Sequence, residues 1–120
     1  MPSTASLYER LGGGQRIAAI VEETLDRHAV NPVLAPRLRG KDLPRLKERL
    51  VLFFCAGAGG PQRYDGDVRA AHTGLNINEQ ELVAAMDDIV AAMRAAGAGP
   101  AEVNEVVAIL YSLKEDVLRL

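Results

Sequence analysis

A glycine-rich segment broken by a proline lies at the middle of the chain and restricts the folds that the chain can adopt. Residues 57–66 contain four glycines and Pro61, a composition that a helix does not cross. An apolar stretch precedes this segment, and Asp67 follows it as the cap of a brief helix that carries His72. The sequence therefore predicts a long helix, a loop over 57–66, and a very short helix that presents one imidazole.

Helical periodicity accounts for most of the remaining chain. Apolar residues recur at steps of three and four, as on one face of an α-helix, and no stretch alternates as a strand would. Two capping-box patterns, Ser6 with Glu9 and Asn78 with Glu81, mark helix starts. We expect helices over residues 7–11, 15–28 (after Gly12, Gly13 and Gly14), 33–38, 43–56 (after Asp42), 68–72, 79–96, and from Pro100 to about Val117. The predicted fold class is all-α.

Length, charge and cysteine content exclude several classes of protein. With 120 residues and 48% apolar content, residues 1–120 suffice for one domain, in which we expect residues 1–5 to be a disordered tail. A net charge of -2 gives no footprint for nucleic acid or a membrane surface. The single cysteine, Cys55, excludes an internal disulfide and predicts a small buried side chain. With neither a signal peptide nor a membrane span in the sequence, we expect a cytoplasmic protein.

The motifs together resemble those of the truncated haemoglobins, the short two-over-two helical globins, and most of all the first group of that family. The residues that carry the resemblance are Leu7-Tyr8-Glu9-Arg10-Leu11-Gly12-Gly13, Phe53-Phe54 through Gly59-Gly60-Pro61 and Tyr64 to Gly66, and Ala71-His72 through Gly74 and Ile77. These motifs span nearly the whole chain. The resemblance implies a two-over-two helical sandwich around haem b.

The resemblance also assigns the residues of the site. His72 matches the proximal iron ligand, its other ring nitrogen held by a backbone carbonyl or water, whereas the residues alone leave an ordinary helix-end histidine open. The implied haem contacts are Leu25, Leu38, Leu46, Arg49, Leu50, Phe53, Tyr64, Val68, His72, Ile77 and Leu82. Arg49 is the expected partner of a propionate, with Lys41, Arg45 and Arg69 as alternates. We interpret His28 as a helix-end or surface histidine rather than a second axial ligand.

The chain departs from the family pattern on the distal side. Leu25 stands where a ligand-binding tyrosine is usual, and Leu46 and Leu50 face the ligand, with glutamine often found at the second position. Leu38 replaces a phenylalanine, and the segment before His72 is one residue shorter. These departures predict an almost wholly apolar distal pocket.

An apolar pocket has a consequence for the choice of gas. A donor stabilises bound dioxygen by about 1 to 3 kcal/mol, and carbon monoxide gains less. We therefore expect fast dioxygen loss and relatively favoured carbon monoxide binding. Thr24 has the one nearby hydroxyl, and in a helix it can instead bond back to the preceding turn.

Three functions from different classes remain open at this stage. The first is reversible binding of diatomic gases, namely O2, CO and NO. The second is a haem enzyme, with catalytic residues unknown, that performs nitric oxide dioxygenation, peroxidase-like chemistry or an engineered group transfer on a small apolar substrate, served by a reductase. The third is a haemless helical interaction module. The retained His72 and the glycine motifs argue against the third.

Overall fold

The computed structural model describes residues 5–120, and it is built from helices. The elements of this part of the chain are α1 (Leu7–Arg10), α2 (Gly13–Val30), α3 (Ala35–Leu38), α4 (Leu43–Gly57), α5 (Val68–His72), α6 (Glu79–Ala95), α7 (Pro100–Ser112) and the 3₁₀-helix η1 (Lys114–Asp116). The all-α prediction is confirmed. The expected tail covers Met1–Ala5, and of these residues 1–4 lie outside the described part. No helix within residues 5–120 is both long and apolar enough to cross a bilayer.

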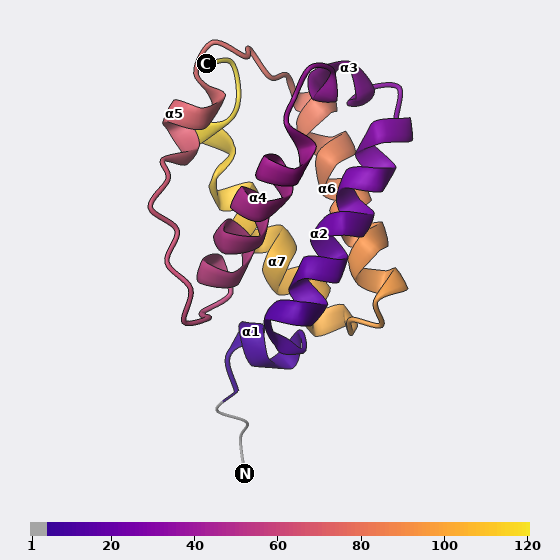
Figure 1. Ribbon diagram of the computed structural model, residues 1–120, viewed down its shortest axis with the longest axis vertical. Helices are drawn as coiled ribbons and strands as arrows, with labels where there is room; N and C mark the ends of the chain where they lie inside the picture. Colours follow the sequence, from indigo (N-terminus) through magenta and orange to yellow (C-terminus); the bar gives the residue numbers. More distant parts are fainter. Residues whose placement is uncertain (1–4) are drawn as a thin grey trace.

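Two antiparallel helix pairs form the body of the molecule (Figure 1). Helix α2 packs against α4 and against α6, and α6 packs in turn against α7. The short helix α5 lies apart from these four helices and contacts η1 near the C-terminus. This is the expected two-over-two arrangement.

Side-chain caps begin the helices where the sequence predicts them. Both capping boxes are present, because Ser6 and Asn78 each accept from the amide three residues on. Asp42 accepts from the Arg45 amide at 3.1 Å, and Asp67 accepts from the Ala70 amide at 3.2 Å. Such caps each stabilise a helix by about 1 kcal/mol. The cap on α5 matters most, because this helix has only five residues.

The prediction that Gly12, Gly13 and Gly14 separate the first two helices is wrong for the last two. Leu11 and Gly12 separate the two helices, Gly12 has a left-handed φ of 98°, and α2 begins at Gly13. The Gly14 amide donates to the Tyr8 hydroxyl at 3.0 Å, so a side chain of α1 satisfies an amide that the start of α2 leaves free. This bond lets α2 begin within the glycine run.

Several other boundaries differ from the prediction: α1 ends at Arg10, α2 continues to Val30, and α3 begins at Ala35. Helix α4 includes Gly57, the residue at which we expected the loop to begin. Helix α7 ends at Ser112, so Leu113 and Val117 lie beyond it rather than on its apolar face. The chain leaves the helix because the C-terminal residues pair with the segment after α5. The Arg119 amide donates to the Ile77 carbonyl oxygen at 2.9 Å. An isolated bridge joins Ile77 to Leu118.

The buried apolar side chains of the described residues, Leu34 apart, gather in one cluster. It takes residues from α1, α2, the end of α4, the end of α6 and the start of α7. Within α4 only Cys55 is buried, at 0% exposure, and neither α3 nor α5 contributes a buried residue. The opposite parts of α4, α6 and α7 carry half-buried apolar side chains instead. We refer to this region, together with α3 and α5, as the half-buried end.

Candidate haem site

His72 is the last residue of α5, and one hydrogen bond fixes its imidazole. Its Nδ1 lies 2.7 Å from the backbone carbonyl oxygen of Val68, one turn earlier. A carbonyl oxygen only accepts, so Nδ1 carries the proton and donates it. The neutral ring then leaves the Nε2 lone pair available for a metal, which is the tautomer that a proximal ligand needs.

The side chains predicted to contact haem are mostly apolar and are unevenly buried. Leu25 is buried at 9% exposure. All the other predicted contacts are half-buried, and they are Leu38, Leu46, Arg49, Leu50, Phe53, Tyr64, Val68, His72, Ile77 and Leu82. Covering half-exposed apolar surface with an apolar partner lowers the free energy of the protein. This set fits a flat apolar group that is bound by one imidazole.

The described residues do not offer a metal site made of side chains alone. Among residues 5–120, no group of three or more His, Cys, Asp or Glu side chains comes together. Cys55 is fully buried, and burial raises the pKa of its thiol, which confirms the prediction of a small buried side chain. A metal at His72 would therefore take most of its ligands from a prosthetic group, as iron does in a porphyrin.

The positions expected on the distal side of a haem carry no free donor. The Thr24 hydroxyl is buried and donates to the Ile20 carbonyl oxygen at 2.8 Å. This bond to the preceding turn is the alternative that its helical position predicted. Leu46 and Leu50 of α4 pack against the buried cluster and carry no polar atom. The side chains at these positions thus leave the space beside α4 apolar.

Arg49 already has partners within the chain. Its guanidinium donates to Asp65 at 3.0 Å and lies 5.1 Å from the centroid of the Tyr64 ring. Arg49 lowers the pKa of the Asp65 carboxyl, mainly through this hydrogen bond. The side chain of Asp65 is 87% exposed, so the pair is weak and exchangeable. Tyr64 also meets the ring of Phe53 edge-on at 5.3 Å, which packs the loop against α4.

His28 is held away from this region. Its Nδ1 lies 2.7 Å from the Asp88 carboxylate, which also accepts from the Asn31 amide at 3.2 Å. The side chain of His28 is only 15% exposed. The helix-end position is confirmed, whereas the side chain is more buried than that of a surface histidine because α6 covers it.

Comparison with known proteins places the chain. A family model described as bacterial-like globin matches residues 6–119. The chain belongs to the bacterial-like globin family. Among curated relatives, it is 29% identical to the group 1 truncated haemoglobin GlbN of Mycolicibacterium paratuberculosis, over 94% of this chain and 84% of that protein. It is 27% identical to GlbN of a Nostoc species, over 95% of this chain and 98% of that protein. The resemblance to group 1 truncated haemoglobins is thereby confirmed.

Solved globin structures share the fold. The truncated haemoglobin of Tetrahymena pyriformis in its Fe(III) form superposes with a TM-score of 0.93 at 22% identity, covering 97% of this chain and all of that one. The cyanomet 2/2 haemoglobin of a Synechococcus species, which carries covalently attached haem, gives 0.88 at 26% identity over 95% and 98% of the two chains. Membership of this family implies a haem cofactor and small gas ligands for this globin.

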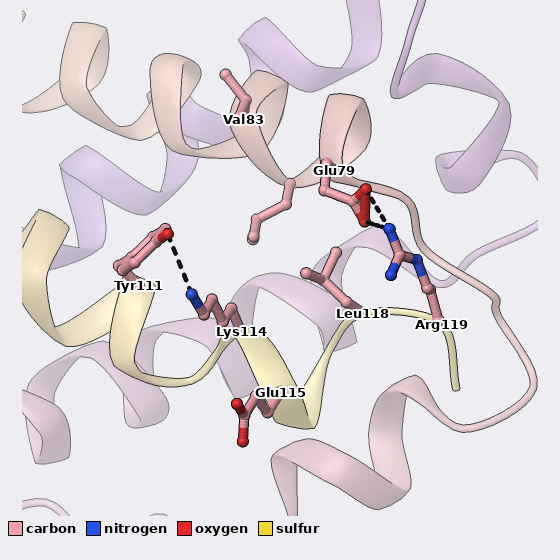
Figure 2. Close-up of a pocket in the computed structure, with 8 residues that line it drawn as sticks. Glu79, Val83, Tyr111, Lys114, Glu115, Leu118 and Arg119 are labelled. Atoms are coloured by element: carbon pink, nitrogen blue, oxygen red, sulfur yellow. Dashed lines mark hydrogen bonds and ion pairs between the residues drawn. The ribbon is translucent and has the colours of Figure 1, made fainter.

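Leu82, one of the predicted haem contacts, lines a cleft between α6 and the C-terminal segment. Leu82 and Val83 of α6 line this cleft of about 560 Å³ with Tyr111 and the C-terminal segment (Figure 2). No residue of α4 or α5 lines this cleft, so it does not reach His72. Lys114 donates to the Tyr111 hydroxyl at 3.1 Å, and both residues lie on the C-terminal side of the cleft.

Sequence reasoning missed two sets of contacts near the site. One is the pairing of residues 76–77 with the C-terminal segment, where the Asn76 amide donates to the Leu120 carbonyl at 2.9 Å. The other is the pair between Arg37 of α3 and Glu81 of α6. Both join residues that are more than forty positions apart in the chain, and no local pattern predicts such pairs.

Proposed function

We propose that this globin is a haem b protein in which His72 is the proximal iron ligand and the apolar distal side binds diatomic gases reversibly. The observation that carries the proposal is the hydrogen bond from His72 Nδ1 to the Val68 carbonyl at 2.7 Å. That bond holds the ring in the tautomer whose Nε2 can bind iron. The bound haem supplies the iron atom at which a small gas molecule binds.

The half-buried apolar side chains support the same site. Leu46, Leu50 and Phe53 follow one face of α4 at steps of three and four, and Val68 and His72 lie one turn apart on α5. Each of these side chains is half-buried. An apolar macrocycle between α4 and α5 would cover them and remove their remaining surface from water.

The distal residues favour gas binding over dioxygenation of nitric oxide. That reaction needs a held dioxygen, and a donor is what holds it. Leu25, Leu46 and Leu50 have none, and the Thr24 hydroxyl donates to Ile20. The same apolar surface suits carbon monoxide, nitric oxide and other small apolar ligands.

The test is the visible absorption spectrum of the purified protein in the ferric, dithionite-reduced and carbon monoxide-bound states. We expect an intense haem band that shifts on reduction and again on adding carbon monoxide. In a His72→Ala variant the band should be lost or strongly altered. His28→Ala is the matched control, because it removes the other histidine, whose Nδ1 bonds to Asp88 rather than to a carbonyl of α5.

The outcomes separate the parts of the proposal. A wild-type protein that takes up no added haem would refute the cofactor. A His72→Ala spectrum identical to that of the wild type would refute the ligand assignment while leaving the cofactor in place. Loss of the band in His28→Ala alone would move the ligand to the end of α2.

A further inference from the structure

Arg37 makes three hydrogen bonds that join distant parts of the chain. Its Nε and one terminal nitrogen donate to the two oxygens of Glu81, at 2.5 and 2.9 Å. Its other terminal nitrogen donates to the backbone carbonyl oxygen of Leu75 at 2.8 Å. A guanidinium is suited to this role because its planar fork binds a carboxylate through two nitrogens and still has donors to spare. We call this set of contacts the Arg37 clamp.

The α6 end of the clamp is firmly placed. The side chain of Glu81 is only 11% exposed, and it also accepts from the Asn78 amide as part of the capping box at the start of α6. Arg37 lowers the pKa of Glu81, mainly through its hydrogen bonds, so the carboxylate stays charged at neutral pH. The capping box of α6 therefore holds the acceptor in place, and Arg37 of α3 reinforces its charge.

The Leu75 end of the clamp lies in the turn that follows His72. The Leu75 amide donates to the His72 carbonyl oxygen at 3.1 Å, which closes this turn. Gly74 within the turn has a φ of 87°, and Asn76 has a φ of 50°, unusual for a residue with a side chain. Arg37 thus bonds to a turn whose backbone conformation needs support from its surroundings.

Helix α5 has little else to hold its position. It has five residues, none of them buried, and its main packing partner is η1. On that side Arg69 donates to the Glu115 carbonyl at 3.3 Å and to Asp116 at 3.4 Å, through exposed groups. The C-terminal segment and the Arg37 clamp hold the segment that follows. Of these contacts, the clamp alone connects that segment to α3, where Leu38 lies.

We propose that Arg37 is a positioning residue for His72, which acts by fixing the turn through which α5 continues into α6. This inference rests on the proposed role of His72 as the iron ligand. Residues that orient a metal-binding histidine change metal affinity and the electronic properties of the site when they are replaced, commonly by about 10- to 100-fold in affinity. Arg37 acts through a turn rather than through the ring itself, so the lower end of that range applies.

The experiment uses the full-length, haem-loaded protein and an Arg37→Gln variant. The first readout is the iron–histidine stretching band of the ferrous protein in resonance Raman spectra, which reports the strain and orientation of the imidazole. We expect the band to shift or broaden in Arg37→Gln. The second readout is haem transfer to excess apomyoglobin, which we expect to be about tenfold faster. Arg37→Lys should be intermediate, since one ammonium keeps the charge and loses the planar fork.

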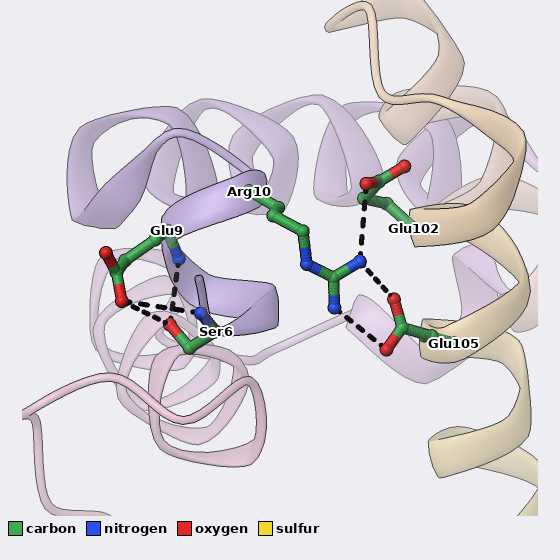
Figure 3. A network of polar contacts seen from close by, with 5 residues as sticks. All are labelled: Ser6, Glu9, Arg10, Glu102 and Glu105. Carbon is green, nitrogen blue, oxygen red and sulfur yellow. Dashed lines mark hydrogen bonds and ion pairs between the residues drawn. The ribbon is translucent and has the colours of Figure 1, made fainter. Parts of the chain in front are cut away.

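Arg10→Gln is the matched control. Arg10 of α1 also forms a two-nitrogen pair with a glutamate, at 2.5 and 2.9 Å to Glu105, and donates to Glu102 at 3.3 Å (Figure 3). This network joins α1 to α7 and touches neither α5 nor the segment after it. We expect Arg10→Gln to lower stability and to leave the iron–histidine band and the haem transfer rate unchanged.

Each result decides the inference. A wild-type band in Arg37→Gln, or an equal change in Arg10→Gln, would overturn it and reduce the clamp to general support of the fold. If Arg37→Gln does not fold, Arg37→Lys takes its place, and a wild-type band in Arg37→Lys would then overturn the inference. A wild-type protein that binds no haem, or a His72→Ala variant that keeps the band, would instead refute the proposed function.

Discussion

Leu50→Gln should convert the distal side from apolar to hydrogen-bonding and shift the preference of this globin from carbon monoxide towards dioxygen. Leu50 lies on α4, is half-buried, and has nearly the volume of glutamine. The amide that replaces it would be the first donor free to face the ligand, because the Thr24 hydroxyl donates to the Ile20 carbonyl at 2.8 Å. The gain is thus that of one new hydrogen bond.

The size of the effect follows from the energy of that bond. A donor stabilises bound dioxygen by about 1 to 3 kcal/mol, and every 1.4 kcal/mol is about tenfold in an equilibrium constant. The ratio of carbon monoxide to dioxygen affinity should fall by about fivefold to about 140-fold. Because the bond forms only with bound dioxygen, most of the change should appear as slower dioxygen dissociation, which stopped-flow mixing of the oxygenated protein with carbon monoxide measures.

Two further variants serve as controls for this prediction. Leu43→Gln places the same amide on the first turn of α4, where the side chain is 41% exposed, and should leave the ratio unchanged. Thr24→Val should also leave dioxygen dissociation unchanged, since the hydroxyl it removes is occupied within α2. A Leu50→Gln protein with an intact haem spectrum and an unaltered ratio would refute the predicted position of Leu50. Faster dioxygen loss in Thr24→Val would refute the assignment of that hydroxyl.

Two predictions concern stability. Gly60→Ala should cost about 1 to 3 kcal/mol in urea unfolding, because its Cβ would lie 2.5 Å from a ring carbon of Tyr8. Gly57→Ala serves as the control: its Cβ would meet no neighbouring part of the fold within 4 Å, and because Gly57 lies in α4 the change should be neutral or slightly stabilising. Arg10→Gln should lower the melting temperature at neutral pH and converge with the wild type in acid. Arg10 lowers the pKa of Glu105, so the stability this pair provides is complete above the ordinary glutamate pKa and is lost as the pH falls through the lower folded value. Parallel melting curves at every pH would contradict the second prediction.

The sequence predicted those features of the fold that depend on neighbouring residues. Caps act over three residues and amphipathic faces over one or two turns, so the starts of α1 and α6 and the cap of α5 were predictable. The end of α7 was not, because the chain leaves the helix to pair with Ile77, a contact across about forty residues. The predicted start of α2 was wrong because Tyr8, a side chain of the preceding helix, satisfies the Gly14 amide.

In the candidate site, too, contacts within one helical turn were predictable from the sequence and contacts with a loop were not. The intrahelical bonds of His72 and Thr24 each span four residues, and both agree with what helical spacing predicts. Arg49 was expected to meet a propionate, and the structure pairs it with Asp65 of the following loop, whose path the sequence does not fix. The roles of these residues towards haem remain predictions that the spectra and variants described above address.

The uneven burial of the two ends of the molecule has a consequence for how it opens. Local unfolding requires little free energy where few apolar side chains are buried, and the full unfolding free energy where the core is. Amide protons of α3 and α5 should therefore exchange with solvent long before those near Ile17 and Met93, both 0% exposed. A ligand that binds only the folded half-buried end raises its opening free energy with the logarithm of ligand concentration. With haem bound at His72 as proposed, the supply of cofactor would set the mobility of α5, and hydrogen exchange at His72 would report how much of the protein is loaded.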